Sequence, residues 1–335
     1  MLIIDKPGGI PLMLKSKLLT LSIAVAAATA FTPLTAMSAE SDDPIQVIDN
    51  NWSSQKVLAR VAKQMLDQIG YNTELVTLDT QSQFAAMGTG DAHLQMEVWE
   101  GSMNASFMKE VDAGRMVDGG SHEATTREEW WYPNYVEEIC PGLPDYKALN
   151  DCADLLSSPE TSPSARYLSG PAEWHPEDVE RIEALGLDVV IVNAGSADAL
   201  FGELKSAASR KEPIILFNWA PNWVGAAYPG KFIEFPRRDA ENKCVTDPSW
   251  GVNPDMANDC GAAVGGYLKK GLWSGFAEKY PCANELVSNI NFTGPMIDSA
   301  AAMVDVEGMD HDAAATKWIE SNQAVADGWI PSCAG

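Results

Sequence analysis

Three tryptophans stand where predicted β-strands end, namely Trp52, Trp99 and Trp219. An indole ring offers a hydrophobic surface and a negative face, and both attract a cation that is covered by methyl groups. A trimethylammonium group is such a cation, because it cannot donate strong hydrogen bonds to a carboxylate. If the three rings converge, their types and positions therefore predict an aromatic cage for a methylated amine.

Further aromatic residues are candidates for the same cage. Trp174 lies in the loop "SGPAEWHPED", and Trp131 and Tyr132 lie in "EEWWYPNY". A buried cation–π contact is worth about 2 kcal/mol, so three or four of them are enough for a dissociation constant near micromolar. We expect the acids near these aromatics to be mostly solvated, or else to add negative potential or donate a hydrogen bond when protonated: Glu97, Glu128, Glu129, Glu137 and Glu173.

The elements that must position these residues alternate between strand and helix. A strand at residues 45–48 precedes a helix that is capped by Ser53 or Ser54 and stops at Gly70. Further strands are predicted in "NTELVTL", "HLQMEVWEG", "ARYLSG", "DVVIVNAGS" and "EPIILFNW", with a Ser196-capped helix before the last. This order predicts mostly parallel sheets, which bind ligands at the carboxyl ends of their strands.

The chain is long enough for two α/β lobes, and its C-terminal third is expected to be mostly helical, most clearly in "HDAAATKWIESNQAVADGWI". We assign residues 40–140 and 245–335 to one lobe and residues 141–244 to the other, with the ligand cleft between them. Basic residues number 23 against 47 acidic ones, and such a field repels nucleic acid and anionic membranes.

The N-terminus has the pattern of a secretory signal. Lys15 and Lys17 precede an apolar run and a small-residue cleavage motif, so we expect residues 1–39 to be removed on export to the periplasm, with Met13 a possible true start. An even number of cysteines in an exported protein favours disulfides. Pairing between sequence neighbours is the simplest of the fifteen connectivities: Cys140–Cys152, Cys244–Cys260 and Cys282–Cys333.

The segment "NWAPNWVG" resembles the W-x-P-x-W segment of the substrate-binding proteins of ABC importers for glycine betaine, proline betaine, choline and trimethylamine N-oxide. "MEVWEG" and "DGWI" are similar to other segments of that family. The resemblance implies a two-lobed periplasmic binding protein that closes on its ligand, with Trp99 and Trp219 as cage walls. It also matches Trp52 to a wall of the choline binders and Trp174 to one of the betaine binders. The chain departs from the family at Asn222 and in "EGSMN", which leaves the residue for the ligand's polar end open.

The prediction is therefore a monomeric receptor that delivers glycine betaine, trimethylamine N-oxide or a related osmolyte to a membrane permease, without a cofactor or a resident metal. Choline, the sulfonium compound dimethylsulfoniopropionate, and a carbohydrate are alternative ligands. An enzyme is disfavoured, because the four histidines have no metal-ligand spacing and no nucleophile elbow is present. A calcium site in "DPSWGVNPDMANDC" is a further alternative, with Asp247, Asp255 and Asp259 as oxygen ligands.

Overall fold

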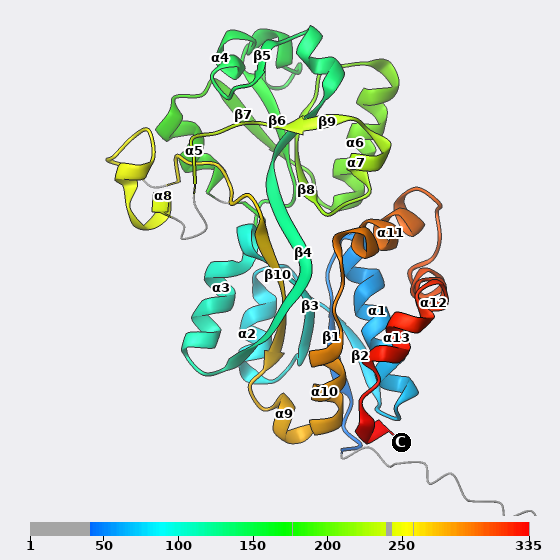
Figure 1. Cartoon of the computed structure of the whole chain (residues 1–335). Helices are drawn as coiled ribbons and strands as arrows, with labels where there is room; N and C mark the ends of the chain where they lie inside the picture. The colour runs from blue at the N-terminus through cyan, green and yellow to red at the C-terminus, as the bar shows by residue number, and fades with distance from the viewer. Residues whose placement is uncertain (1–40, 176, 239–242, 257, 335) are drawn as a thin grey trace, which may run out of the picture. The chain divides into compact units, whose positions relative to one another are not determined.

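The computed structural model describes residues 41–175, 177–238, 243–256 and 258–334, and the predicted signal segment, residues 1–39, lies outside this range. The described residues form a mixed sheet with helices on its faces (Figure 1). The strands of the sheet are β1 (Ile45–Asp49), β2 (Thr73–Thr77), β3 (Leu94–Trp99), β4 (Met116–Pro133), β6 (Ala165–Ser169), β7 (Val189–Asn193), β8 (Ile215–Ala220), β9 (Gly230–Phe232) and β10 (Gly266–Trp273). The short strand β5 (Pro141–Pro144) is not part of this sheet.

The sheet has two halves that share the long strand β4. In the first half β1 pairs in parallel with β2 and β3, and β10 joins β3 to the start of β4 by antiparallel pairing. In the second half β6 pairs in parallel with β7 and β8, and the end of β4 pairs antiparallel with β8 and β9. Within β4 the partner changes from β10 to β8 between Thr126 and Arg127.

The predicted parallel strands are confirmed, whereas β4 and β10 are strands that the sequence analysis did not identify. The segment "MVDGGSHEATTREEWWYP" contains two glycines and exposed acids in its first part, so it has no apolar run that would mark a buried strand. These two strands make the sheet mixed. They also carry the chain between its halves, as Figure 1 shows for β4.

Helices cover both faces of each half (Figure 1). In the first half α1 packs on one face together with α11 and α12, while α2 and α3 pack on the other. The helices are α1 (Ser53–Gln68), α2 (Ser82–Thr89), α3 (Glu100–Asp112), α4 (Ala148–Asp151), α5 (Asp178–Leu185), α6 (Ala197–Arg210), α7 (Val224–Ala227), α8 (Lys243–Thr246), α9 (Phe276–Lys279), α10 (Pro281–Asn289), α11 (Gly294–Asp305), α12 (His311–Ser321) and α13 (Gln323–Trp329). Short 3-10 turns are η1 (Asn134–Glu138), η2 (Asp154–Leu156), η3 (Pro248–Trp250) and η4 (Ser332–Ala334).

Helix ends agree with the sequence analysis in part. Ser196 caps α6 by accepting a hydrogen bond from the Ala199 N–H, as predicted. The predicted serine cap of α1 is wrong, because Trp52 is the N-cap residue and the hydroxyls of Ser53 and Ser54 make other contacts. The predicted continuous C-terminal helix is also wrong, since it breaks into α12 and α13 at Asn322.

All three predicted disulfides are present: Cys140–Cys152, Cys244–Cys260 and Cys282–Cys333. The first two close short loops, whereas the third ties α10 to the C-terminal turn η4, which lies 51 residues further along the chain. A link across so many residues restricts the unfolded chain more than a short loop does. The third disulfide therefore fixes the C-terminal segment to the first half of the molecule.

Candidate functional site: a pocket walled by four tryptophans

Four of the predicted cage residues line one pocket, namely Trp52, Trp99, Trp174 and Trp219. The space between them that no atom fills is about 270 Å³, open solvent at its mouth included. All four side chains are buried, with at most 7% of their surface exposed. The remaining lining residues are Thr80, Ser102, Met103, Glu128 and Phe217.

The ring of Trp174 is nearly perpendicular to two of the other indole rings. Trp174 lies 5.9 Å from Trp52 and 5.7 Å from Trp219, between ring centroids, with interplanar angles of 85° and 81°. Phe217 lies 5.6 Å from Trp219 and 5.8 Å from Trp174. Near-perpendicular contacts let each ring support its neighbour by edge-to-face packing while the walls face different directions.

Strand ends bring these residues together from distant parts of the sequence. Trp52 follows β1, Trp99 ends β3, and Trp219 is the penultimate residue of β8. Trp174 lies in the loop between β6 and α5, where Gly170 leaves room for its ring: a Cβ at that position would lie 2.3 Å from an indole carbon. The pocket is therefore built from both halves of the sheet, at the ligand-binding edge of open α/β sheets.

Hydrogen bonds join the two halves near the pocket. The backbone N–H of Thr80 donates to the Glu173 carboxylate at 3.3 Å, and the side-chain amide of Gln81 donates to the Glu173 carbonyl at 3.4 Å. Lys205 of α6 donates to the carbonyl of Asp305 at the end of α11. These contacts hold the aromatic walls of both halves against one another.

Glu128 is the acidic group of the pocket lining. One of its oxygens accepts hydrogen bonds from the backbone N–H groups of Gly101 and Ser102, at 2.8 and 3.3 Å, in the first turn of α3. A Cβ at Gly101 would lie 2.6 Å from this oxygen, so glycine permits the contact. Burial raises the pKa of Glu128, although His175 and the N–H donors oppose the shift.

Behind Glu128 lies a charged cluster, which we define as Glu129, His175, Glu177, Asp178, Arg181 and Arg238. With Glu128 and Phe217, these residues line a second, neighbouring cavity. Arg181 donates to the carboxylates of Glu129 and Asp178, at 2.9 Å in both cases. The imidazole of His175 lies 2.8 Å from Glu177 and 3.8 Å from Glu128.

Charge compensation sets the protonation of His175. Burial alone would lower its pKa, but the carboxylates of Glu177, Asp178 and Glu128 outweigh burial and raise the pKa to about 9. The imidazole is therefore a cation at neutral pH and lies beside one wall of the tryptophan pocket. Its Nε2 has no hydrogen-bond partner among the described residues.

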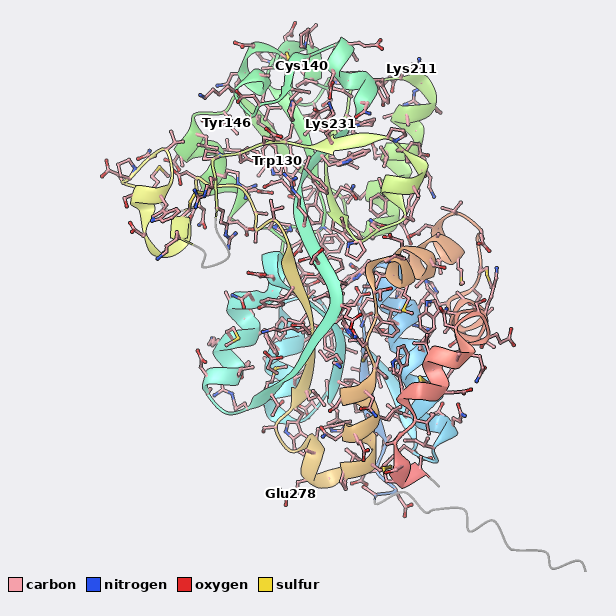
Figure 2. All side chains as sticks on the ribbon, in the orientation of Figure 1. Trp130, Cys140, Tyr146, Lys211, Lys231 and Glu278 are labelled. Carbon is pink, nitrogen blue, oxygen red and sulfur yellow. A yellow bond between two sulfur atoms is a disulfide. The ribbon has the colours of Figure 1, made fainter. Side chains whose placement is uncertain are left out.

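Trp131 and Tyr132 were predicted for the cage, but the structure does not bring them to the pocket. Both belong to the part of β4 that pairs with β9, where Trp131 packs against Gly230 and Tyr132 donates to Glu137. Figure 2 shows their neighbour Trp130 within the second half, where it stacks on Tyr167 at 3.8 Å. Trp223, the second indole of "NWAPNWVG", is also outside the pocket and packs on Phe201.

Sequence reasoning missed four lining residues: Thr80, Ser102, Met103 and Phe217. Phe217 stands two residues before Trp219 on the same strand, so side-chain alternation was a signal for it. Thr80 follows the carboxyl end of β2, and the rule that marked the tryptophans applies to it as well. The expectation that most nearby acids are solvated is wrong for Glu97, Glu128 and Glu129, which are buried.

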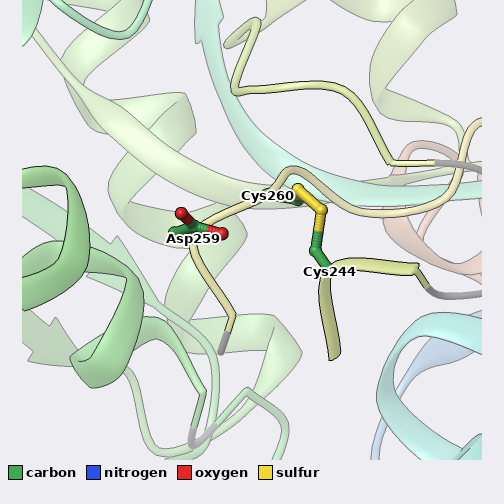
Figure 3. A group of neighbouring side chains, drawn as sticks. All are labelled: Cys244, Asp259 and Cys260. Carbon is green, nitrogen blue, oxygen red and sulfur yellow. A yellow bond between two sulfur atoms is a disulfide. The ribbon is translucent and has the colours of Figure 1, made fainter. Parts of the chain in front are cut away.

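Among the described residues, the cluster of possible metal ligands is Cys244, Asp259 and Cys260 (Figure 3). The two sulfur atoms are bonded to one another, so neither is a free thiolate and Asp259 alone keeps its ligand atom. Asp247 and Asp255, which the sequence suggested as calcium ligands with Asp259, are exposed and do not belong to this cluster. The Asp259 carboxylate instead accepts a hydrogen bond from the Asn253 N–H.

Residues 43–321 match the model of the family described as the substrate-binding domain of ABC-type glycine betaine transport systems. The chain belongs to this family. It is 39% identical over 304 residues to the trimethylamine N-oxide-binding protein of Pelagibacter ubique (strain HTCC1062), a match that covers 88% of this chain and 92% of that relative. Members of the family bind and deliver ligands for transport, and they are not enzymes.

Solved structures support the fold. An ABC-transporter choline-binding protein in complex with choline is 16% identical and has a TM-score of 0.70, over 87% of this chain and 92% of that one. Lactococcal OpuAC, in its closed form with glycine betaine, is 16% identical with a TM-score of 0.64, over 87% of this chain and all of the other. The predicted two-lobed binding-protein fold is thereby confirmed. None of the helices in the described ranges has the length and apolar character needed to cross a membrane.

Proposed function

We propose that this chain binds a small trimethylammonium compound, with trimethylamine N-oxide as the preferred ligand, in the pocket between Trp52, Trp99, Trp174 and Trp219. The observation that carries the proposal is the convergence of four indoles from separate segments on one small pocket. Four buried cation–π contacts supply about 8 kcal/mol, which corresponds to a micromolar Kd before the costs of association are subtracted.

The polar lining favours the N-oxide over a betaine. Thr80, Ser102 and Glu128 are the polar lining residues among those described, and none of the lining residues is basic. A betaine carboxylate requires several donors or a cation, and it would face the Glu128 carboxyl group. An N-oxide oxygen requires a single donor, which Glu128 provides when it is protonated, and its raised pKa favours that form. The 39% identical relative is named for the same ligand.

Choline is the ligand that most sharply tests this assignment. Its hydroxyl group donates a hydrogen bond and therefore prefers the ionised Glu128 carboxylate, whereas the N-oxide prefers the protonated acid. Raising the pH through the titration of Glu128 should weaken binding of trimethylamine N-oxide and strengthen binding of choline. Calorimetry from pH 5 to 8 measures the affinities for trimethylamine N-oxide and choline. Glycine betaine, dimethylsulfoniopropionate and maltose are titrated in the same way as competing candidates. Tighter binding of betaine or maltose at every pH would contradict the proposal.

The cage walls have their own test. Trp99→Ala and Trp219→Ala should each weaken binding at least tenfold, because each removes an indole face from the methylated cation. The exposed Trp250 is a matched control, since it lies outside the pocket, and Trp250→Ala should leave the affinity unchanged. Thermal melts of the ligand-free variants show whether the fold survives. A loss of binding that merely follows a loss of folding would identify the rings as core residues.

The site between the halves also suggests how delivery works. We infer that residues 40–140 with 245–335, and residues 141–244, act as two bodies that enclose the ligand between them. The closed form is then presented to the permease of an ABC importer. We further infer that the signal segment directs a monomeric receptor to the periplasm. Mass spectrometry of the exported protein gives the cleavage site, and light scattering gives the oligomeric state.

A further inference from the structure

Glu97 is a buried acid on β3 that does not line the tryptophan pocket. Its side chain is fully buried. A carboxylate in such a place is costly unless it is paired or well hydrogen-bonded, so its partners indicate what it does.

One oxygen of Glu97 accepts three hydrogen bonds. The donors are the indole N–H of Trp52 at 2.6 Å, the indole N–H of Trp99 at 3.1 Å and the Ser54 hydroxyl at 3.1 Å. Trp52 and Trp99 come from different segments, after β1 and at the end of β3, and both line the pocket. A shared acceptor fixes the rotation of both rings, so Glu97 sets the angle between two cage walls.

The three donors are neutral, and the second oxygen of Glu97 has no hydrogen-bond partner among the described residues. The charged groups on neighbouring elements have other partners, because Asp49 of β1 pairs with Lys56 and Arg60 of α1, and Asp305 of α11 accepts from Ser53. Burial raises the pKa of Glu97 to about 7, although the three donors oppose the shift. The carboxylate thus forms near neutral pH without a cation of the protein beside it.

An ionised acceptor also changes the indoles. A hydrogen bond to a carboxylate is stronger than one to a neutral acceptor. It moves electron density from the N–H into the ring, and a ring with more negative faces attracts a cation more strongly. The two rings held by Glu97 transmit its charge to the pocket in this way.

We propose that Glu97 is a positioning residue that also provides the counter-charge of the cage: its carboxylate orients the indoles of Trp52 and Trp99 and stabilises a trimethylammonium group bound against them. The ligand part of this inference rests on the proposed function, whereas the orientation of the indoles does not.

The first test needs no ligand. In the ligand-free protein labelled with ¹⁵N-tryptophan, the indole N–H resonances of Trp52 and Trp99 should shift together with a midpoint near pH 7. They should be insensitive to pH over the same range in Glu97→Gln. Separate midpoints, or an unchanged titration in the variant, would overturn the assignment of Glu97 as their common acceptor. This result is independent of whether trimethylamine N-oxide binds.

The second test separates charge from shape. Glu97→Gln keeps the side-chain shape and one acceptor oxygen but removes the charge. The ratio of variant to wild-type Kd for trimethylamine N-oxide should be near one at pH 6 and about ten at pH 8. Dividing by the wild-type Kd at the same pH removes the part of the Glu128 effect that both proteins share. A ratio that stays the same at both pH values would contradict the counter-charge role.

A matched control removes the same charge elsewhere. Glu278 lies on the surface at the end of the first half away from the pocket (Figure 2), so Glu278→Gln should give a ratio near one at both pH values. Thermal melts at pH 8 provide the readout of folding. Glu97→Gln should melt no lower than wild type, because it no longer buries a charged group. A lower melting temperature with equal binding would mark Glu97 as a structural residue and overturn the proposal.

Discussion

Two neighbouring interior regions share Glu128 and Phe217 but differ in how they handle charge. The tryptophan pocket has four indoles and no basic residue among its described lining. The charged cluster behind it compensates its acids with Arg181 and with the imidazole of His175. The difference indicates where a cationic ligand is needed, because the cluster already contains its cations whereas the pocket has negative ring faces without one.

The largest expected effect comes from the ring at the centre of the aromatic walls. Trp174 contacts both Trp52 and Trp219, so Trp174→Ala removes one wall and the support of two others. We expect a loss of at least a hundredfold in affinity for trimethylamine N-oxide, about 3 kcal/mol, measured by calorimetry. Trp174→Phe should recover part of the loss. Full affinity in the alanine variant would show that the pocket does not depend on this wall.

The charged cluster should respond in stability. The pKa of His175 is about 9 in the folded protein and about 6.5 in an unfolded chain, so its contribution is fully present below pH 6.5 and is lost as pH rises through 9. Chemical unfolding at several pH values should show wild type losing roughly 2 kcal/mol relative to His175→Gln between pH 6.5 and 9.

The control for this pH dependence is His311, which lies on α12 outside the cluster. Burial lowers the pKa of His311, so it titrates below pH 6.5 and His311→Gln should keep the wild-type slope between pH 6.5 and 9. Glu177→Gln, by contrast, removes a carboxylate that contacts His175 and should reduce the slope. Equal slopes in all four proteins would show that the cluster does not hold a protonated imidazole.

The aromatic site could be predicted because its signal is local in the sequence. Trp52, Trp99 and Trp219 each lie at or just after the end of a predicted strand, and the edge of a parallel sheet brings such positions together. The charged cluster gives no local signal. By residue type, Arg181 is expected on the exposed side of α5, and Glu129 is one of two adjacent acids; the fold brings the Arg181 guanidinium to the Glu129 carboxylate on β4. Only the tertiary contact between them reveals a buried ion pair.

The same reason explains the errors. Trp131 and Tyr132 were predicted for the cage by residue type, without a strand end to place them. The segment from Met116 to Pro133 has few consecutive apolar residues, so β4 was not identified and the side on which its aromatics lie was unknown. Conversely, the three disulfides followed from sequence neighbourhood. Cys140–Cys152 and Cys244–Cys260 close short loops, and their pairing left Cys282 and Cys333 to pair across 51 residues.

A smaller effect is expected from the glycine that admits Trp174. A methyl group at Gly170 would lie 2.3 Å from the ring, so Gly170→Ala should displace this wall and weaken ligand binding about tenfold. Gly195 is the matched control, because a Cβ there meets nothing within 4 Å. Gly195→Ala should bind as wild type does. Equal affinity in both variants would mean that Trp174 has freedom to move without loss of the cage.

The smallest effect is expected at Trp131. This prediction tests whether binding depends on where an aromatic side chain lies or only on its being aromatic. Its ring packs against Gly230 near β9, and a Cβ at Gly230 would lie 1.9 Å from it. Trp131→Phe keeps an aromatic ring in that contact, so affinity for trimethylamine N-oxide should change less than twofold while the melting temperature falls slightly. The same exchange at Trp219, which lines the pocket, should weaken binding several-fold, because phenylalanine is a smaller and weaker cation–π partner than tryptophan. If the two exchanges weaken binding equally, the ligand contacts the second half of the sheet more widely than the four-tryptophan pocket allows.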